Sequence, residues 1–136
     1  VATYPPRNCG IATFTYDLAH AVANQLGGRN TFRIVALNNR PEGYDYADEV
    51  AFEIGQNQIH DYRLAAEYIN VSRADLVCLQ HEFGIFGGPE GSYVTHLLRN
   101  LRKPIVSTSI FGTSAWSRCE PRRPRPGHTV SDQRGG

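Results

Sequence analysis

Two polar segments of the chain contain residue types that can bind a ligand, and each begins where an apolar, strand-like stretch ends. The first, Pro5–Gly10, joins an apolar start to a helical pattern through two prolines and a glycine. The second, His81–Gly88, places a histidine and a glutamate before a glycine-rich loop. A histidine can hydrogen-bond a hydroxyl or titrate near neutral pH, and a carboxylate can accept hydrogen bonds from two hydroxyls. We therefore expect any binding site to lie on these two segments.

The elements that must position these segments alternate between strand-like and helical patterns over residues 1–108. Short β-branched and apolar runs predict strands at 1–4, 31–37, 49–54, 76–79 and 104–108. Apolar stripes at helical spacing predict three helices, with these buried positions: Ile11, Phe14, Leu18, Ala21, Val22 and Leu26; Ile59, Tyr62, Ala65, Ala66 and Ile69; Tyr93, Leu97, Leu98 and Leu101. The alternation predicts an α/β fold with a parallel sheet. Parallel strands share one carboxyl edge, where such sheets bind ligands, so 5–10 and 81–88 should lie side by side.

The composition is that of one folded domain and excludes several other classes of protein. The chain has 136 residues, of which 40% are apolar and 20% charged, enough for one core. No apolar run approaches the roughly 18 residues of a membrane span, and no signal peptide precedes Val1, so the sequence predicts a soluble, cytoplasmic protein. Cys9, Cys78 and Cys119 lie far apart without a C-x-x-C pair. That spacing predicts reduced thiols and neither a disulfide framework nor a zinc site.

Residues 109–136 break the alternating pattern and form an Arg- and Pro-rich tail. Residues 119–127 contain three prolines in nine positions, a density that neither a helix nor a central strand tolerates. Residues 112–136 carry five arginines against Glu120 and Asp132, a formal net charge of +3. A basic tail can bind nucleic acid or membranes, but this composition is also typical of a GC-rich gene read out of frame. We expect a disordered tail created by a frameshift between about Ser107 and Gly112, and no nucleic-acid partner.

Three segments resemble, in the same order, the amino-terminal domain of the retaining group-1 glycosyltransferases with the GT-B fold. They are Tyr4–Phe14 (YPPRNCGIATF), Asp61–Asn70 (DYRLAAEYIN) and Leu79–Gly88 (LQHEFGIFGG). The resemblance covers residues 1–108, less than half of such an enzyme. It implies a Rossmann-like parallel sheet with flanking helices, which is one half of a GT-B fold. It also implies the transfer of a hexose from a nucleotide-sugar donor to a sugar or glycan acceptor.

For the first motif, the resemblance implies that Gly10 and Ile11 face the diphosphate of the sugar nucleotide across a cleft between two domains. The local sequence is compatible with that role. A helix that begins at Gly10 offers unpaired N–H groups and about half a positive charge to a phosphate. The structural alternative is an ordinary turn between a strand and a helix.

For the third motif, the resemblance implies four residues that bind sugar on the acceptor side: His81, Glu82, Gly87 and Gly88. The structural alternative is that His81 caps the sheet edge and Glu82 pairs with Arg7, while the glycines only satisfy a turn. No residue is assigned a catalytic role. No metal or cofactor is expected, and the nucleotide-sugar donor would act as a co-substrate.

The spacing of Glu82 and Glu90, with seven residues between them, matches a donor-binding signature of the same family. That signature belongs to the family's second domain, in a different context. Here Glu90 is expected in the first turn of a helix, where a carboxylate interacts favourably with the helix dipole. We therefore interpret the match as a coincidence.

The resemblance stops before a complete enzyme. In the family, the strand that corresponds to 104–108 continues into a His-containing loop, whereas this chain reads SIFGTSAWS over 109–117. The donor-binding domain is absent, so we predict the acceptor-side part of a glycosyltransferase that is inactive by itself. The alternative is a non-catalytic sugar- or phosphate-binding module that acts with a separately encoded domain. An unrelated nucleotide-binding α/β domain would need a complete glycine fingerprint and an acidic residue after the next strand, and neither is convincing here.

Overall fold

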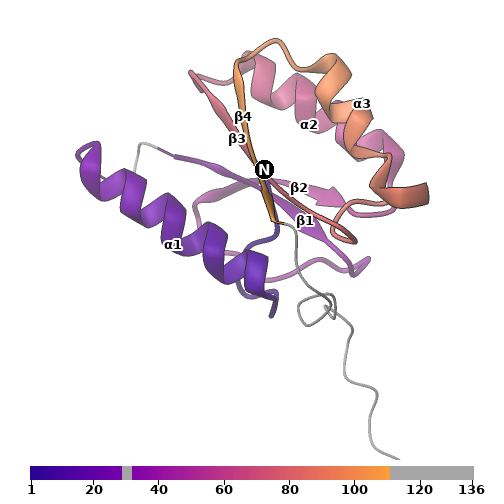
Figure 1. Cartoon of the computed structure of the whole chain (residues 1–136), viewed down its shortest axis with the longest axis horizontal. Helices are drawn as coiled ribbons and strands as arrows, with labels where there is room; N and C mark the ends of the chain where they lie inside the picture. Colours follow the sequence, from indigo (N-terminus) through magenta and orange to yellow (C-terminus); the bar gives the residue numbers. More distant parts are fainter. Residues whose placement is uncertain (29–31, 111–136) are drawn as a thin grey trace, which may run out of the picture.

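The computed structural model describes residues 1–28 and 32–110 and shows a mixed α/β architecture (Figure 1). The elements follow one another as α1 (Gly10–Gln25), β1 (Ile34–Asn38), β2 (Val50–Gly55), α2 (Ile59–Val71), β3 (Val77–Glu82), the 3₁₀ turn η2 (Pro89–Gly91), α3 (Val94–Asn100) and β4 (Ile105–Ile110). β1 pairs with β2 and β3 pairs with β4, both in parallel. The α/β class and the parallel pairing predicted from the sequence are confirmed. The expectations for the tail beyond Ile110 lie outside the described residues.

The start of the chain lies between the two strand pairs. On one side, the Ala2 N–H donates to the Val35 carbonyl at 3.1 Å, and the Leu37 N–H donates to the Ala2 carbonyl at 2.9 Å. On the other side, the Gln80 N–H donates to the Val1 carbonyl at 3.0 Å. Residues 1–2 thus connect β1 to β3, and the order across the structure is β2, β1, residues 1–2, β3 and β4.

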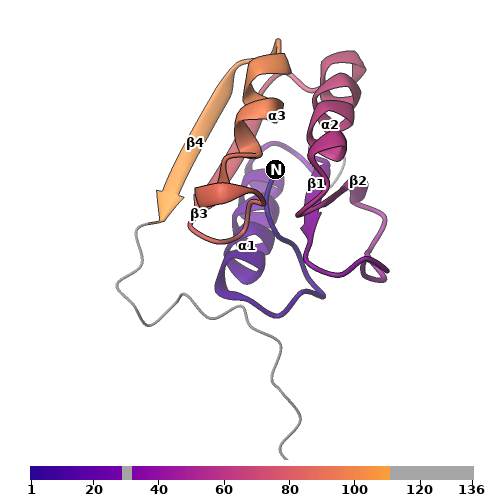
Figure 2. The ribbon, with the colours of Figure 1, turned by 90° about the vertical axis from the view of Figure 1, so that its right-hand side faces the viewer.

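Helices lie on both sides of these strands. α1 covers one face, and α2 and α3 lie together on the other (Figures 1 and 2). β1 shows why both faces must be covered, because all five of its residues are buried. Val35 and Leu37 belong to a core cluster shared with α2 and α3, whereas Ile34 and Ala36 pack with Tyr4 in a second cluster. Such burial on both faces is typical of a central parallel strand.

The buried face of α2 is the predicted one at Tyr62, Ala65, Ala66 and Ile69, whereas Ile59, the first residue of the predicted stripe, is 39% exposed. The prediction for α1 is wrong in part. Its buried residues are mostly small: Ile11, Ala12, Thr15 and Ala23. Three large apolar residues of the expected stripe are 39% to 66% exposed: Phe14, Val22 and Leu26. Small side chains allow α1 to lie close to the sheet, so the larger ones are left beside the contact rather than in it.

Two boundaries differ from the sequence prediction in a way that affects the site. β3 continues to Glu82, so His81 and Glu82 are its last two residues rather than the start of a loop. They remain in the strand because β4 also continues further than predicted, and its last two residues, Ser109 and Ile110, are their register partners.

Glu90 does not lie in the first turn of α3, as the sequence predicted. It lies in η2 with a φ of 53°, and α3 begins only at Val94. Gly88 and Gly91 also have positive φ angles, 79° and 75°. A right-handed helix cannot run through residues with positive φ, so the third helix is shortened to seven residues.

Candidate functional site

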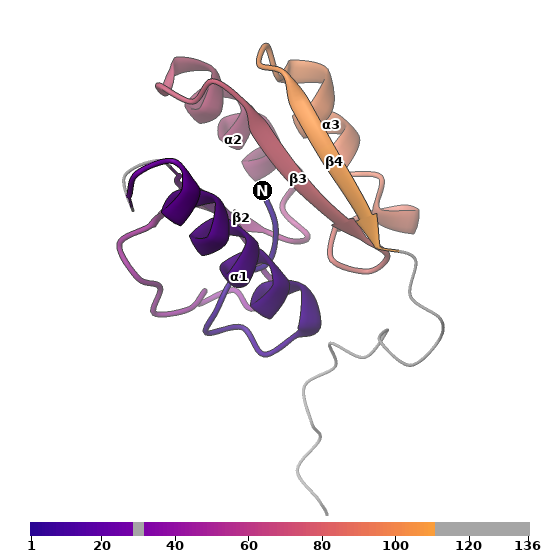
Figure 3. The same ribbon diagram turned by 60° about the vertical axis from the view of Figure 1, so that its left-hand side comes forward.

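The two segments singled out from the sequence leave the sheet at the same edge. The Val1 ammonium donates to the Cys78 carbonyl at 2.6 Å, and the Val1 carbonyl accepts from the Gln80 N–H. This pattern aligns the chain start in parallel with β3, so the chain leaves Tyr4 and Glu82 at neighbouring carboxyl ends. The connections then run to opposite faces, one through α1 and the other through α3 (Figure 3). Open α/β sheets bind ligands where adjacent connections diverge in this way.

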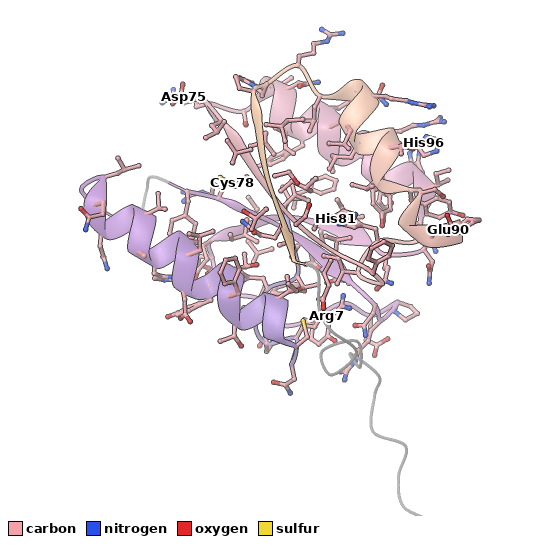
Figure 4. All side chains as sticks on the ribbon, in the orientation of Figure 1. Arg7, Asp75, Cys78, His81, Glu90 and His96 are labelled. Atoms are coloured by element: carbon pink, nitrogen blue, oxygen red, sulfur yellow. The ribbon has the colours of Figure 1, made fainter. Side chains whose placement is uncertain are left out.

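Arg7 is the buried cation of this edge. Its side chain is 4% exposed, and its Nη1 donates to the Leu37 carbonyl at 3.0 Å. Its buried Nε has no hydrogen-bond partner among the described residues. Figure 4 shows Arg7 at the end of the structure opposite Asp75, which precedes β3. A buried donor without a partner is costly, so Arg7 has an unused N–H beside the predicted binding segments.

α1 begins at Gly10, three residues after Arg7, and its amino terminus carries no side-chain cap. Cys9 is the N-cap residue, and it makes no hydrogen bond from its side chain to the helix. Its Sγ lies instead 3.2 Å from the Thr3 hydroxyl. Gly10 is exposed, whereas the Ile11 side chain is buried in the core. Ile11 can therefore offer a ligand only its backbone N–H. This N–H lies at a helix amino terminus whose partial positive charge no side chain compensates.

The end of β3 contributes the polar side chains of the site. The His81 ring is stacked on Phe86 at a centroid distance of 5.4 Å and stands nearly perpendicular to Phe83 at 6.0 Å. Burial raises the pKa of Glu82, and the charge of Arg7 opposes that shift. His81 and Glu82 are each half-buried. His81 thus has the aromatic packing of a structural residue and the partial exposure that a ligand-binding residue needs.

Packing accounts for both predicted glycines without a ligand. A Cβ on Gly87 would overlap the carbonyl oxygen of Gln56, and a Cβ on Gly88 would overlap the ring of Tyr93. The Gly87 N–H donates to the Tyr62 hydroxyl at 3.0 Å, and that hydroxyl donates to the Gln56 carbonyl at 2.8 Å. Tyr62 therefore joins the loop after β3 to the loop after β2. These glycines hold the shape of the edge rather than forming its ligand-facing surface.

A third loop, residues 39–49, brings Tyr46 near the charge of Arg7. The Tyr46 hydroxyl donates to the Asn38 side chain at 2.6 Å, and the Tyr44 hydroxyl donates to Asn39 at 2.8 Å. Burial and the charge of Glu53 raise the pKa of Tyr46, while the charge of Arg7 lowers it. Tyr44 is thus bonded within the loop, and Tyr46 joins the loop to the last residue of β1.

Sequence reasoning mentioned Arg7 only as a partner for Glu82 and missed its place at the centre of the edge. The only sequence signal was its position between two prolines and a helix start.

No protein-family model, curated protein or solved structure matches this chain. In residues 1–28 and 32–110, no helix is long and apolar enough to cross a membrane. The same part of the chain contains no group of three or more histidines, cysteines or acidic residues placed to hold a metal ion. What the structure defines is an α/β protein with parallel strand pairs, whose polar edge combines Arg7, the α1 amino terminus, His81 and Glu82.

Proposed function

We propose that this domain is the acceptor-side half of a retaining GT-B glycosyltransferase and that its polar edge binds a nucleotide-sugar donor and a sugar or glycan acceptor. The observation that supports the proposal most is the meeting of the first and third motifs at one edge. The order β2, β1, residues 1–2, β3, β4 is compatible with a Rossmann-like sheet, and in this proposal the edge lies at its switch point. These two motifs are far apart in the sequence, and the parallel alignment of the chain start with β3 brings them together.

The two parts of the edge suit the two parts of a sugar nucleotide. The α1 amino terminus and the Arg7 guanidinium offer N–H donors and positive charge to a diphosphate. His81 and Glu82 offer hydrogen-bond partners to sugar hydroxyls. In this proposal Arg7 holds the phosphate-side loop against β1 through the Leu37 carbonyl and contributes its positive charge to the phosphate side of the edge.

The first test is ligand binding measured on backbone amide NMR signals. Uridine diphosphate and inorganic pyrophosphate are expected to shift the Gly10 and Ile11 signals, and Arg7→Met is expected to weaken binding about tenfold, the loss of one charged contact of 1–2 kcal/mol. Arg33→Met is the matched control, because Arg33 is an exposed arginine at the amino end of β1. If Arg7→Met fails to fold, Arg7→Lys is used instead, because lysine keeps the positive charge but lacks the guanidinium. Equal effects at positions 7 and 33 would contradict the phosphate-side assignment.

The second test is sugar transfer by the chain alone, and we expect none. Enzymes need at least about 8 kcal/mol of transition-state stabilisation, whereas a helix end and one arginine in an open edge supply a few kcal/mol. The resemblance gives the remaining charges to a second domain. Purified chain is incubated with labelled nucleotide sugars and mixed glycan acceptors. Turnover by the wild-type chain that disappears in His81→Ala would show that the described edge is sufficient for catalysis. That result would contradict the expectation that the chain alone is inactive.

A further inference from the structure

On the α1 side of β3 and β4, the surface around Cys78 and Val106 is uncovered in the described part of the chain, whereas Gln80, further along the same face of β3, is buried. Val77 and Leu79 belong to the core shared with α2 and α3, so their neighbour Cys78 points to the opposite face. Cys78 and its register partner Val106 are both exposed, Val106 by 52%. Figure 3 shows α2 and α3 behind these two strands, while α1 lies to one side. Parallel sheets are normally covered on both faces, so this surface is an unusual one for a monomer.

β4 is also an unprotected edge. It forms the outer margin of the ribbon in Figure 2 and pairs, within residues 1–28 and 32–110, with β3 alone. Its sequence, IVSTSI, contains no charged residue and no proline. The edge strand at the other side, β2, carries Glu53. Proteins usually protect edges with charge, proline or a bulge, because bare edges pair with other strands.

The direction of each backbone group on β4 follows from the printed bonds of its neighbours. Cys78 and Gln80 bond toward Val1, so the alternate residues of β3 bond toward β4. The Val77 N–H indeed donates to the Pro104 carbonyl at 2.9 Å. Positions 106, 108 and 110 of β4 therefore bond to β3. The N–H and C=O groups of positions 105, 107 and 109 point away from the sheet.

We propose that β4 pairs with β4 of a second copy of this chain, antiparallel, around a two-fold axis at Ser107. Residues 105, 107 and 109 are evenly spaced about that axis. Ser107 then exchanges both backbone bonds with Ser107 of the second copy, and Ile105 does the same with Ser109 of the second copy. The outward backbone groups of residues 105, 107 and 109 then all find partners on β4 of the second copy. This self-complementarity is what a two-fold interface requires.

The charges beside β4 favour the same arrangement. Arg102 and Lys103 precede the strand, and the Lys103 ammonium donates to the Ser72 carbonyl at 3.3 Å. Glu82 lies at the other end, as the register partner of Ile110. Antiparallel pairing places the basic end of one copy beside the acidic end of the other, whereas parallel pairing would place like charges together.

Sedimentation velocity of the full chain over a range of concentrations tests the proposal, and a monomer–dimer equilibrium is expected. Ser107→Pro removes an outward N–H that β3 does not use, and proline is tolerated on sheet edges. It is expected to raise the dimer dissociation constant at least tenfold. Ser107→Ala keeps the N–H and is expected to leave the constant within about twofold. Circular dichroism checks that each variant is folded.

A second variant covers the case in which Ser107→Pro fails to fold. Val106→Lys places a charge on the exposed face of the edge and is expected to dissociate the dimer. Val71→Lys changes an 85% exposed valine at the end of α2 and serves as the control. Amide exchange gives the direct signature, because the N–H groups of 105, 107 and 109 are protected only in the dimer. A monomer at all concentrations, or a dimer insensitive to both edge variants, would overturn the proposal.

Discussion

Replacing Gly87 by alanine is expected to lower the free energy of unfolding by about 3 kcal/mol, the upper end of the usual cost of overpacking. The added Cβ would overlap the Gln56 carbonyl oxygen, a backbone atom that cannot rotate away. Moving the loop back would also break the bond from the Gly87 N–H to the buried Tyr62 hydroxyl. Chemical denaturation of the wild type and the variant measures the difference.

Gly84→Ala is the matched control for this result. Gly84 lies in the same loop with a φ of 90°, and nothing lies within 4 Å of a Cβ built on it. Its substitution therefore costs only the unfavourable backbone angle, about 1 kcal/mol. A clearly larger loss at Gly87 than at Gly84 is expected. Equal losses would mean that the contact with Gln56 does not fix the loop, and the packing explanation for Gly87 would be wrong.

The sequence predicted the alternation of elements and much of the core because those features depend on local patterns. The α2 stripe is an example, since Tyr62, Ala65, Ala66 and Ile69 are buried as predicted. The prediction for α1 was wrong in part because the buried face of a helix depends on the space between the helix and the sheet, which the local sequence does not determine. There the close contact is made by Ala12 and its small neighbours, and the bulky side chains lie beside it.

The site was predictable only in outline. Parallel strands explain why the segments after Tyr4 and Glu82 leave the sheet at one edge, and that argument needs no distant contact. The burial of Arg7 could not be predicted, because its partner is the Leu37 carbonyl, thirty positions away in the sequence. The packing role of Gly87 could not be predicted either, because a Cβ at this position would overlap the carbonyl oxygen of Gln56, which is distant in the sequence. The residue types indicated which hydrogen bonds and charges the site could offer. Long-range packing determined which of these groups are available to a ligand.

For a polypeptide of these 136 residues with a free amino group on Val1, the free energy of unfolding is expected to fall as the pH is lowered from about 8.5 to 5.5. Burial between the strands lowers the pKa of this amino group from 8.0 to about 6. Above pH 8 the group is neutral in both the folded and the unfolded chain, so it has no effect. Between pH 8 and 6 the unfolded chain binds a proton that the folded chain does not, which favours unfolding. Below pH 6 both states are protonated and the loss is complete.

The shift of the Val1 pKa sets an upper limit on this loss. Two pKa units correspond to at most about 2.7 kcal/mol, and less to the extent that water reaches the half-buried Val1. Acetylation of the amino terminus is the control, because it removes the charge but keeps an N–H for the Cys78 carbonyl. Denaturation curves of both forms are compared across the pH range, so that contributions such as that of Glu82 cancel. A pH dependence that survives acetylation unchanged would show that the ammonium is solvated and that the chain start does not lie firmly between β1 and β3.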